Sequence, residues 1–186
     1  MLSGFAEMIK HGLIADKDYY YELKAANYQH ITTAAIHRSV EIKNEVVTED
    51  PLEKGRRKIL NFGHTIGHAV ESYSLSKDKK PLTHGEAIAI GMICEAWLSH
   101  KNSTLSEEEL EEIRGYISSV YPAYKIKEKS FDQLSVLMQS DKKNEHGNIL
   151  FTLLESIGNC TYNCRVSESD IRESMEYYNL TYAKRA

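Results

Sequence analysis

The sequence predicts a mainly helical domain with one short β element near residues 140–155. Apolar residues recur at helical spacing through most of the chain, and polar N-cap residues precede several of these runs. One run, ILFTLL at 149–154, has the length and apolar character of a strand and follows turn residues at 146–148. No glycine-rich turn links a strand to a helix, so the sequence offers no unit that would hold a dinucleotide.

The first half of the chain is expected to form four helices. In the first, at 3–16, Phe5 and Leu13 belong to one apolar face, and Ser3 is the expected N-cap. The same periodicity predicts the others, and Pro51 ends the third of them. These further helices are expected over residues 16–27, 30–50 and 56–73.

The second half begins after a polar loop at 76–81. The run at 83–100 is apolar or small on nearly every face, which is typical of a helix buried in the middle of a bundle. Ser106 and Glu109 form the pattern of a capping box, which predicts a helix within 103–120. Two further helices are expected at 130–140 and at 167–180, the last with Ser167 or Ser169 as its cap.

Composition places the 186 residues in one domain of an ordinary globular protein, with 41% hydrophobic and 27% charged residues. The net charge of −4, with both signs interspersed, argues against nucleic acid as a partner. No apolar run approaches the roughly 20 residues that span a bilayer, and a signal-peptide pattern is missing, so we expect a cytoplasmic protein without a membrane partner. Three cysteines fit a reducing compartment and are interpreted as structural.

The stretch NFGHTIGHAVE carries His64 and His68 four residues apart, so both imidazoles lie on one face of a helix. This spacing suits a zinc site, although two ordinary helix histidines would show it as well. Thr65 stands where a metalloprotease carries its glutamate, which argues against that class. A third imidazole, His84, begins the apolar helix, where it is either a capping residue or part of a site.

Other polar residues extend this pattern. Glu7 interrupts an apolar helix three residues before Lys10, so it either faces a site or forms a surface ion pair. Arg57 and Asn61 precede His64 by seven and three residues, which predicts a polar stripe along one helix. With the lysines of the DKKN segment, this stripe suggests an anionic substrate such as a phosphate or carboxylate.

The chain resembles the C-terminal domain of 3-dehydroquinate synthase in four segments, which are SGFAEMIKHGLIAD, EIKNEVVTEDPLEKGRRKILNFGHTIGHAVES, LTHGEAIAIGM and DKKN. The resemblance runs over nearly the whole chain, and it is most specific in the second segment and unspecific after about Gly158. It implies the conversion of 3-deoxy-D-arabino-heptulosonate 7-phosphate to 3-dehydroquinate and phosphate, in the shikimate pathway to the aromatic amino acids. It also implies bound NAD, which takes and returns a hydride, and a divalent metal such as zinc or cobalt.

The resemblance assigns the metal to Glu7, His64 and His84, which together would leave open positions for substrate hydroxyls. In this assignment His68 does not bind metal. It lies beside the substrate phosphate and assists its elimination.

The resemblance also implies contacts to the substrate carboxylate, hydroxyls and phosphate. Glu53 is expected to orient groups or handle a proton, and Lys142, rather than Lys143, is expected to bind an anion. With His68, the catalytic set comprises Lys10, Glu53, Arg57 and Asn61. The substrate contacts come from Lys10, Lys43, Arg57, Asn61, His68 and Lys142.

The chain departs from the family's pattern because residues 1–186 correspond to the C-terminal helical domain alone. By comparison with the family, we expect the N-terminal NAD-binding domain to be absent from this chain. We therefore expect a truncated chain that is inactive by itself and that exposes the surface facing that domain. A homodimer is left open. The loop at 73–86 is longer than in many relatives, which could move His84.

Three alternatives stay open at this point. Other sugar phosphate cyclases, such as 2-deoxy-scyllo-inosose and valiolone synthases, share the metal ligands and differ in substrate contacts. Metal-dependent alcohol dehydrogenases have similar helical domains, but the density of cations suits a phosphorylated acid better. A non-catalytic helical module would bind no metal specifically.

Overall fold

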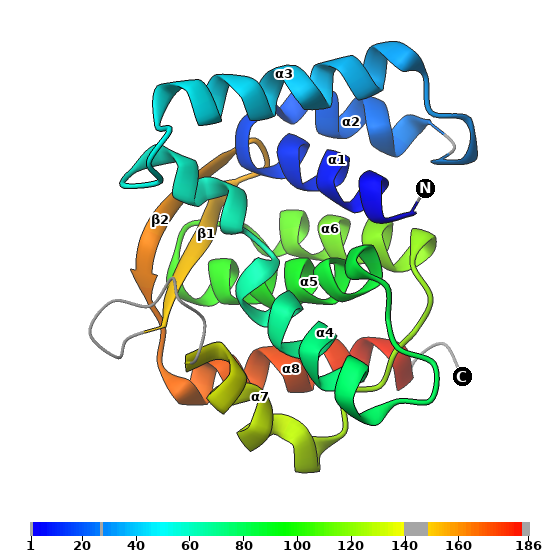
Figure 1. The fold of residues 1–186 in the computed structure, drawn as a ribbon, viewed down its shortest axis with the longest axis vertical. Coiled ribbons are helices and arrows are strands. Elements are labelled where there is room, and N and C mark those ends of the chain that lie inside the picture. The colour runs from blue at the N-terminus through cyan, green and yellow to red at the C-terminus, as the bar shows by residue number, and fades with distance from the viewer. Residues whose placement is uncertain (1, 27, 140–148, 184–186) are drawn as a thin grey trace.

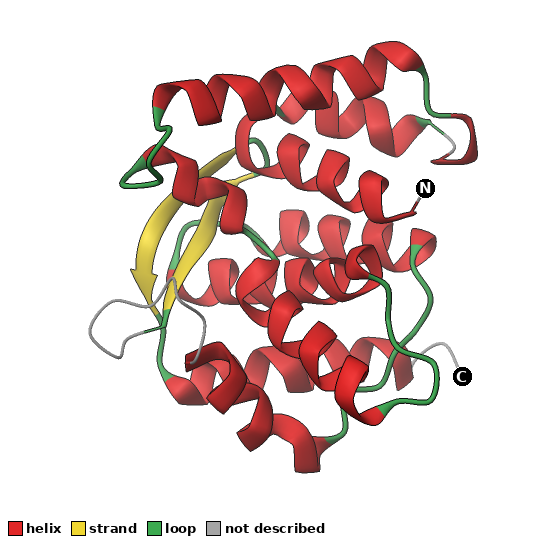
Figure 2. Cartoon of the chain, in the orientation of Figure 1, coloured by secondary structure: helices red, strands yellow, loops and turns green. Residues whose placement is uncertain are grey.

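The structure, a computed structural model, describes residues 2–26, 28–139 and 149–183 and is mainly helical, as the sequence predicts (Figure 2). Its α-helices are α1 (Leu2–Ala15), α2 (Lys17–Ala25), α3 (Thr33–Glu49), α4 (His64–Lys77), α5 (His84–Asn102), α6 (Glu107–Val120), α7 (Phe131–Gln139) and α8 (Glu168–Ala183). The shorter elements are the 3-10 helices η1 (Tyr28–His30), η2 (Arg56–Asn61) and η3 (Glu128–Ser130) and the strands β1 (Leu150–Ser156) and β2 (Asn159–Arg165).

Helix α5 runs through the middle of the domain and contacts α1, α4, α6, α8 and β1 (Figure 1). It is buried along most of its length, with side chains such as Ile88, Met92 and Leu98 inaccessible to solvent. Burial on every side explains why its apolar residues follow no single face, as the sequence predicts. Helices α1, α2 and α3 lie on one side of it and α7 and α8 on the other (Figure 1).

Local capping explains where several helices begin. Ser106 and Glu109 form the predicted capping box at α6, and Ser167 accepts the backbone N–H of Asp170 at α8. The predicted cap at Ser3 is wrong, because α1 already begins at Leu2. The Ser3 hydroxyl instead accepts the backbone N–H of Gly85 at 3.2 Å, which joins the start of α1 to the start of α5.

The helix expected over 56–73 is interrupted. Residues 56–61 form η2, and α4 begins only at His64, after Gly63 adopts a left-handed φ of 77°. The buried carboxyl group of Glu95 on α5 accepts the backbone N–H groups of Gly63 at 2.6 Å and Ile66 at 3.1 Å. Glu95 therefore supplies hydrogen-bond acceptors to the N–H groups at the start of α4 from outside that helix. Because η2 and α4 are separate helices, the prediction of a single polar stripe from Arg57 to His68 is wrong.

The β element is a hairpin, of which the sequence predicts only the first strand. Strand β2 pairs antiparallel with β1, and Phe151 lies opposite Cys164. Gly158, with a φ of 90°, allows the tight turn between the strands. Strand β2 has no apolar run because most of its side chains are exposed or half-buried, so its sequence lacks the usual signal of a strand.

No helix in the described parts of the chain combines the length and the apolar character needed to cross a bilayer. The predicted turn at 146–148 and the predicted anion-binding Lys142 lie outside the described residues.

Candidate metal centre

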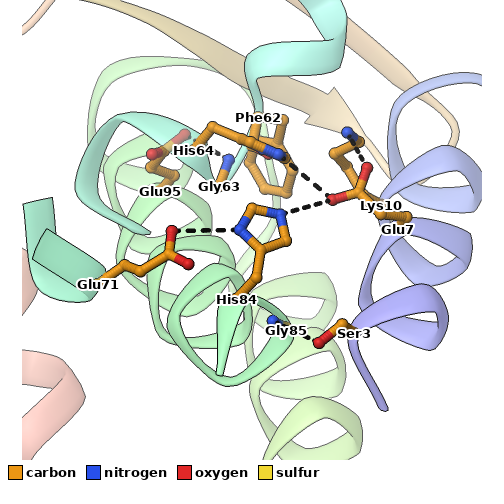
Figure 3. A network of polar contacts seen from close by, with 10 residues as sticks. All are labelled: Ser3, Glu7, Lys10, Phe62, Gly63, His64, Glu71, His84, Gly85 and Glu95. Atoms are coloured by element: carbon orange, nitrogen blue, oxygen red, sulfur yellow. Dashed lines mark hydrogen bonds and ion pairs between the residues drawn. The ribbon is translucent and has the colours of Figure 1, made fainter. Parts of the chain in front are cut away.

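Three side chains from three helices meet at one point, as Figure 3 shows. Glu7 lies in the second turn of α1, and His64 and His84 are the first residues of α4 and α5. Glu7 Oε1 lies 3.3 Å from His64 Nε2 and 3.6 Å from His84 Nε2. One ligand atom from each residue lies within 4.8 Å of the other two, which is close enough for all three to bind one ion.

Each of these side chains is also held on the side that faces away from the meeting point. Glu7 Oε2 accepts a hydrogen bond from Lys10 Nζ at 2.6 Å, and His64 Nδ1 lies 3.0 Å from the carbonyl oxygen of Phe62. A carbonyl can only accept, so His64 carries its proton on Nδ1 and turns the lone pair of Nε2 toward Glu7. His84 Nδ1 lies 3.2 Å from the carboxylate of Glu71.

The charges of the centre suit a metal site at neutral pH. Burial works to raise the pKa of Glu7. At the acid pH where Glu7 titrates, however, the protonated ring of His64 and the ammonium group of Lys10 outweigh burial and hold this pKa well below its usual range. Burial lowers the pKa of His64, and the contact with Glu7 only partly offsets this shift. At pH 7, Glu7 is therefore ionised and His64 is neutral, which are the forms that bind a divalent cation.

The residues present fit a divalent metal. Glu7 Oε1 is buried, and no donor in the described residues forms a hydrogen bond to it. Instead, this negatively charged oxygen faces the Nε2 atoms of His64 and His84, and the lone pair of His64 Nε2 points toward it, which is unfavourable unless a cation lies between them. Two imidazoles and a carboxylate form a ligand set typical of catalytic zinc. The side chain of His84 is 39% exposed and that of His64 only 12%, so the centre is open on the His84 side.

His68 lies one turn beyond His64 on α4, as the four-residue spacing predicts. Its ring centroid is 5.0 Å from that of His64 and 5.9 Å from that of His84. It lies outside the Glu7–His64–His84 group but belongs to a second group with Glu71 and His84, whose ligand atoms also lie within 4.8 Å of one another.

The other predicted site residues within the described ranges lie on α1, on α3, in η2 and in the segment that leads into η2. Lys10 is almost fully buried in α1, whereas Lys43 is exposed on α3. Asn61 Nδ2 donates to Glu53 Oε1 at 3.0 Å, and Glu53 has a left-handed φ of 55°. The guanidinium group of Arg57 donates to the carbonyl oxygen of Pro51 at 2.9 Å.

Asp50, which belongs to none of the predicted sites, holds the segment that carries Glu53 and Arg57. Its side chain accepts the backbone N–H groups of Lys54, Gly55 and Arg57 at 3.1, 2.7 and 3.1 Å. These hydrogen bonds lower the pKa of the Asp50 carboxyl group, with the bond from Gly55 contributing most. An aspartate that ends a helix just before a proline is the local signal that points to such a turn.

His11 follows Lys10 and is buried between α1 and α3. Its Nδ1 lies 2.8 Å from the hydroxyl oxygen of Ser39. Burial lowers the pKa of His11 to about 3, and the positive charge of Lys10 contributes further. This imidazole is therefore neutral at pH 7 and adds no charge near Lys10 and Glu7.

Two solved enzymes share this fold. A 2-epi-5-epi-valiolone synthase from Streptomyces hygroscopicus subsp. jinggangensis 5008, with NAD+ and Zn2+ bound, aligns with 100% of this chain and 52% of its own, at a TM-score of 0.71 and 21% identity. A 2-deoxy-scyllo-inosose synthase complexed with carbaglucose-6-phosphate, NAD+ and Co2+ aligns with 95% of this chain and 51% of its own, at a TM-score of 0.72 and 26% identity. The fold and the cluster together define a helical domain of the sugar phosphate cyclase class.

Within this class, residues 4–144 match the family described as 3-dehydroquinate synthase C-terminal, and the chain belongs to that family. It is 43% identical to a 3-dehydroquinate synthase from Parabacteroides distasonis, over 98% of this chain and 52% of the relative. It is 38% identical to one from Salinibacter ruber, over 94% of this chain and 48% of the relative. The family that the sequence resembles is thus confirmed, and the chain spans about half the length of these relatives.

Proposed function

We propose that this chain is the metal- and substrate-binding half of a 3-dehydroquinate synthase. The complete enzyme, a carbon–oxygen lyase, would convert 3-deoxy-D-arabino-heptulosonate 7-phosphate to 3-dehydroquinate and phosphate in the biosynthesis of aromatic amino acids. The observation that carries the proposal is the buried Glu7 Oε1, which faces the Nε2 atoms of His64 and His84 without a hydrogen bond from the described residues. The names of the relatives that match over most of this chain support the same reaction.

Glu7, His64 and His84 would hold the divalent metal, zinc or cobalt. When bound, the metal supplies Lewis acidity to a substrate hydroxyl. The half-exposed position of His84 leaves access for the substrate on that side of the centre. Lys10 keeps the Glu7 carboxylate ionised and pointed toward the imidazoles, because its ammonium group occupies the other carboxylate oxygen.

The remaining site residues would bind and orient the substrate. His68, whose ring lies beside those of His64 and His84, would transfer a proton at the leaving phosphate. Asn61 and Glu53 hold each other, so each presents a fixed polar group from the segment before α4. Cations for the carboxylate and phosphate would come from Lys10, Lys43, Arg57 and Lys142.

The solved cyclases contain NAD+, and each is about twice the length that aligns with this chain. We propose that NAD and part of the substrate site are supplied by a further N-terminal domain, so the 186 residues alone do not turn over. A cytoplasmic location and a homodimer belong to the same proposal. The solved inosose and valiolone synthases keep another cyclase reaction as the second candidate. The relatives from Parabacteroides distasonis and Lysinibacillus sphaericus, at 43% and 35% identity, bear the name 3-dehydroquinate synthase and favour the first.

Two experiments test the proposal. Zinc titration of the 186-residue chain against a chromogenic chelator should show one tight site that Glu7→Gln and His64→Ala abolish. A chimera that joins this chain to the N-terminal half of the Parabacteroides distasonis relative should release phosphate from the heptulosonate phosphate and form 3-dehydroquinate. A chimera that binds zinc and NAD but accepts only a sugar phosphate without a carboxylate would favour the second candidate.

A further inference from the structure

Glu71, on α4, has no role in the function proposed above. It lies seven residues after His64 and three after His68, so all three occupy one face of the helix. Its Oε2 lies 3.2 Å from Nδ1 of His84, across from the Nε2 atom that faces Glu7 (Figure 3). The imidazole of His84 thus lies between two carboxylates, one on α1 and one on α4.

We propose that Glu71 is the positioning residue of the metal centre: it holds the proton of His84 on Nδ1 and so presents the Nε2 lone pair beside Glu7. This inference rests on the proposed metal centre and adds to it the group that orients its most exposed ligand. A carboxylate can only accept, so a hydrogen bond to Glu71 requires the Nδ1–H tautomer. A ring nitrogen that donates to a carboxylate is the usual support of a metal-bound histidine.

His84 depends on such support more than the other ligands do. His64 is 12% exposed and is oriented by the Phe62 carbonyl, whereas the His84 side chain is 39% exposed and stands at the first position of α5. Packing alone therefore constrains its ring less, and a half-turn about χ2 would place Cδ2 where Nδ1 lies and Cε1 where Nε2 lies. Glu71 favours one of these two orientations, because only one of them places an N–H against its carboxylate.

The same residues could be arranged differently, since His68, Glu71 and His84 also lie close enough to hold an ion. In that arrangement Glu71 would bind the metal directly, and His84 would use Nδ1. The structure favours the positioning role for Glu71. Its Oε2 already lies at hydrogen-bonding distance from His84, whereas the buried Oε1 of Glu7 has no hydrogen bond within the described residues.

The test measures metal affinity, so it is independent of turnover. Zinc affinity of the 186-residue chain is measured by chelator competition for the wild type, Glu71→Gln and Glu71→Ala. The glutamine oxygen can still accept from Nδ1–H, so the Gln variant should stay within about threefold of wild type, whereas the Ala variant should bind about 10–100-fold more weakly. Glu176→Ala, which removes the same charge from an exposed position on α8, should not change the affinity.

Two spectroscopic readouts separate positioning from direct binding. In the metal-free wild type at pH 8, long-range 1H–15N NMR should show the His84 proton on Nδ1, and this measurement requires no variant to fold. The visible spectrum of the Co2+ form should be the same in Glu71→Gln and wild type.

The inference is overturned by a His84 proton on Nε2 or by a folded Glu71→Ala that binds zinc as the wild type does. It is also overturned if Glu71→Gln binds as weakly as Glu71→Ala and has an altered Co2+ spectrum, because Glu71 would then be a ligand. A wild type that binds no zinc would instead refute the proposed metal centre itself.

Discussion

A methyl group added at Gly91 tests whether the contact between α4 and α5 positions the metal centre. A Cβ atom at Gly91 would lie 1.9 Å from the carbonyl oxygen of Gly63 and 2.7 Å from the backbone nitrogen of Gly67. These are backbone atoms of the turn that begins α4, so no side-chain rotation can relieve the overlap. His64 follows Gly63 directly, and any movement of this turn displaces the imidazole.

The magnitude follows from the overlap. Carbon and carbonyl oxygen normally approach to about 3.3 Å, so the Gly91→Ala variant would have to move α4 away from α5 by roughly 1.4 Å. Overpacking of this kind typically costs about 1–3 kcal/mol, and a backbone clash belongs at the upper end. The higher helix propensity of alanine returns about 1 kcal/mol. The displaced turn also weakens the bond from Gly67 N–H to Gly63 O, so we expect a net loss of about 2–3 kcal/mol in unfolding free energy.

The assay is urea denaturation of the metal-free chain, followed by far-ultraviolet circular dichroism and by the fluorescence of Trp97. Gly115→Ala is the matched control, because a Cβ at Gly115 in α6 meets nothing within 4 Å. This control should gain about 0.5–1 kcal/mol. Zinc affinity should fall with Gly91→Ala and stay unchanged with Gly115→Ala. A Gly91→Ala variant as stable as wild type would show that the backbones of α4 and α5 are not in close contact at this position.

Three further predictions concern buried or strained groups. The pKa of His11 falls from 6.5 in the unfolded chain to about 3 in the folded one. Below pH 6.5 the imidazole of His11 is therefore protonated in the unfolded chain but not in the folded chain, so the free energy of unfolding decreases as the pH falls. Between pH 6.5 and 5, urea midpoints should show that wild type loses about 2 kcal/mol more than His11→Asn; equal losses would contradict this. Each carboxylate oxygen of Glu95 accepts one backbone N–H group, and Glu95→Gln replaces one of these oxygens by an amide donor. This variant should lose about 2 kcal/mol of unfolding free energy in urea denaturation. An unchanged midpoint would argue against the role of Glu95 in holding the first turn of α4. Glu53→Gly should be about 1 kcal/mol more stable in thermal denaturation than Glu53→Ala. Both variants lose the contact with Asn61, but only glycine adopts a φ of 55° without strain. A more stable Glu53→Ala would contradict the strain at this position.

The sequence was sufficient for features that depend on neighbouring residues. The burial of α5, the capping box at Ser106 and the shared face of His64 and His68 all follow from spacings of a few residues. The resemblance carried by longer segments predicted the set of Glu7, His64 and His84, and the structure brings these three together.

Other features depend on contacts between residues far apart in the chain, which no local pattern predicts. The break at Gly63 requires the carboxyl group of Glu95, 32 residues later, and β2 becomes a strand because β1 pairs with it. The orientation of His84 likewise depends on Glu71, whose spacing from His64 was visible in the sequence although its partner was not. Local periodicity determines which residues share a helix face. Only the packing of α1, α4 and α5 determines which of those faces meet, because that choice minimises the free energy of the whole domain.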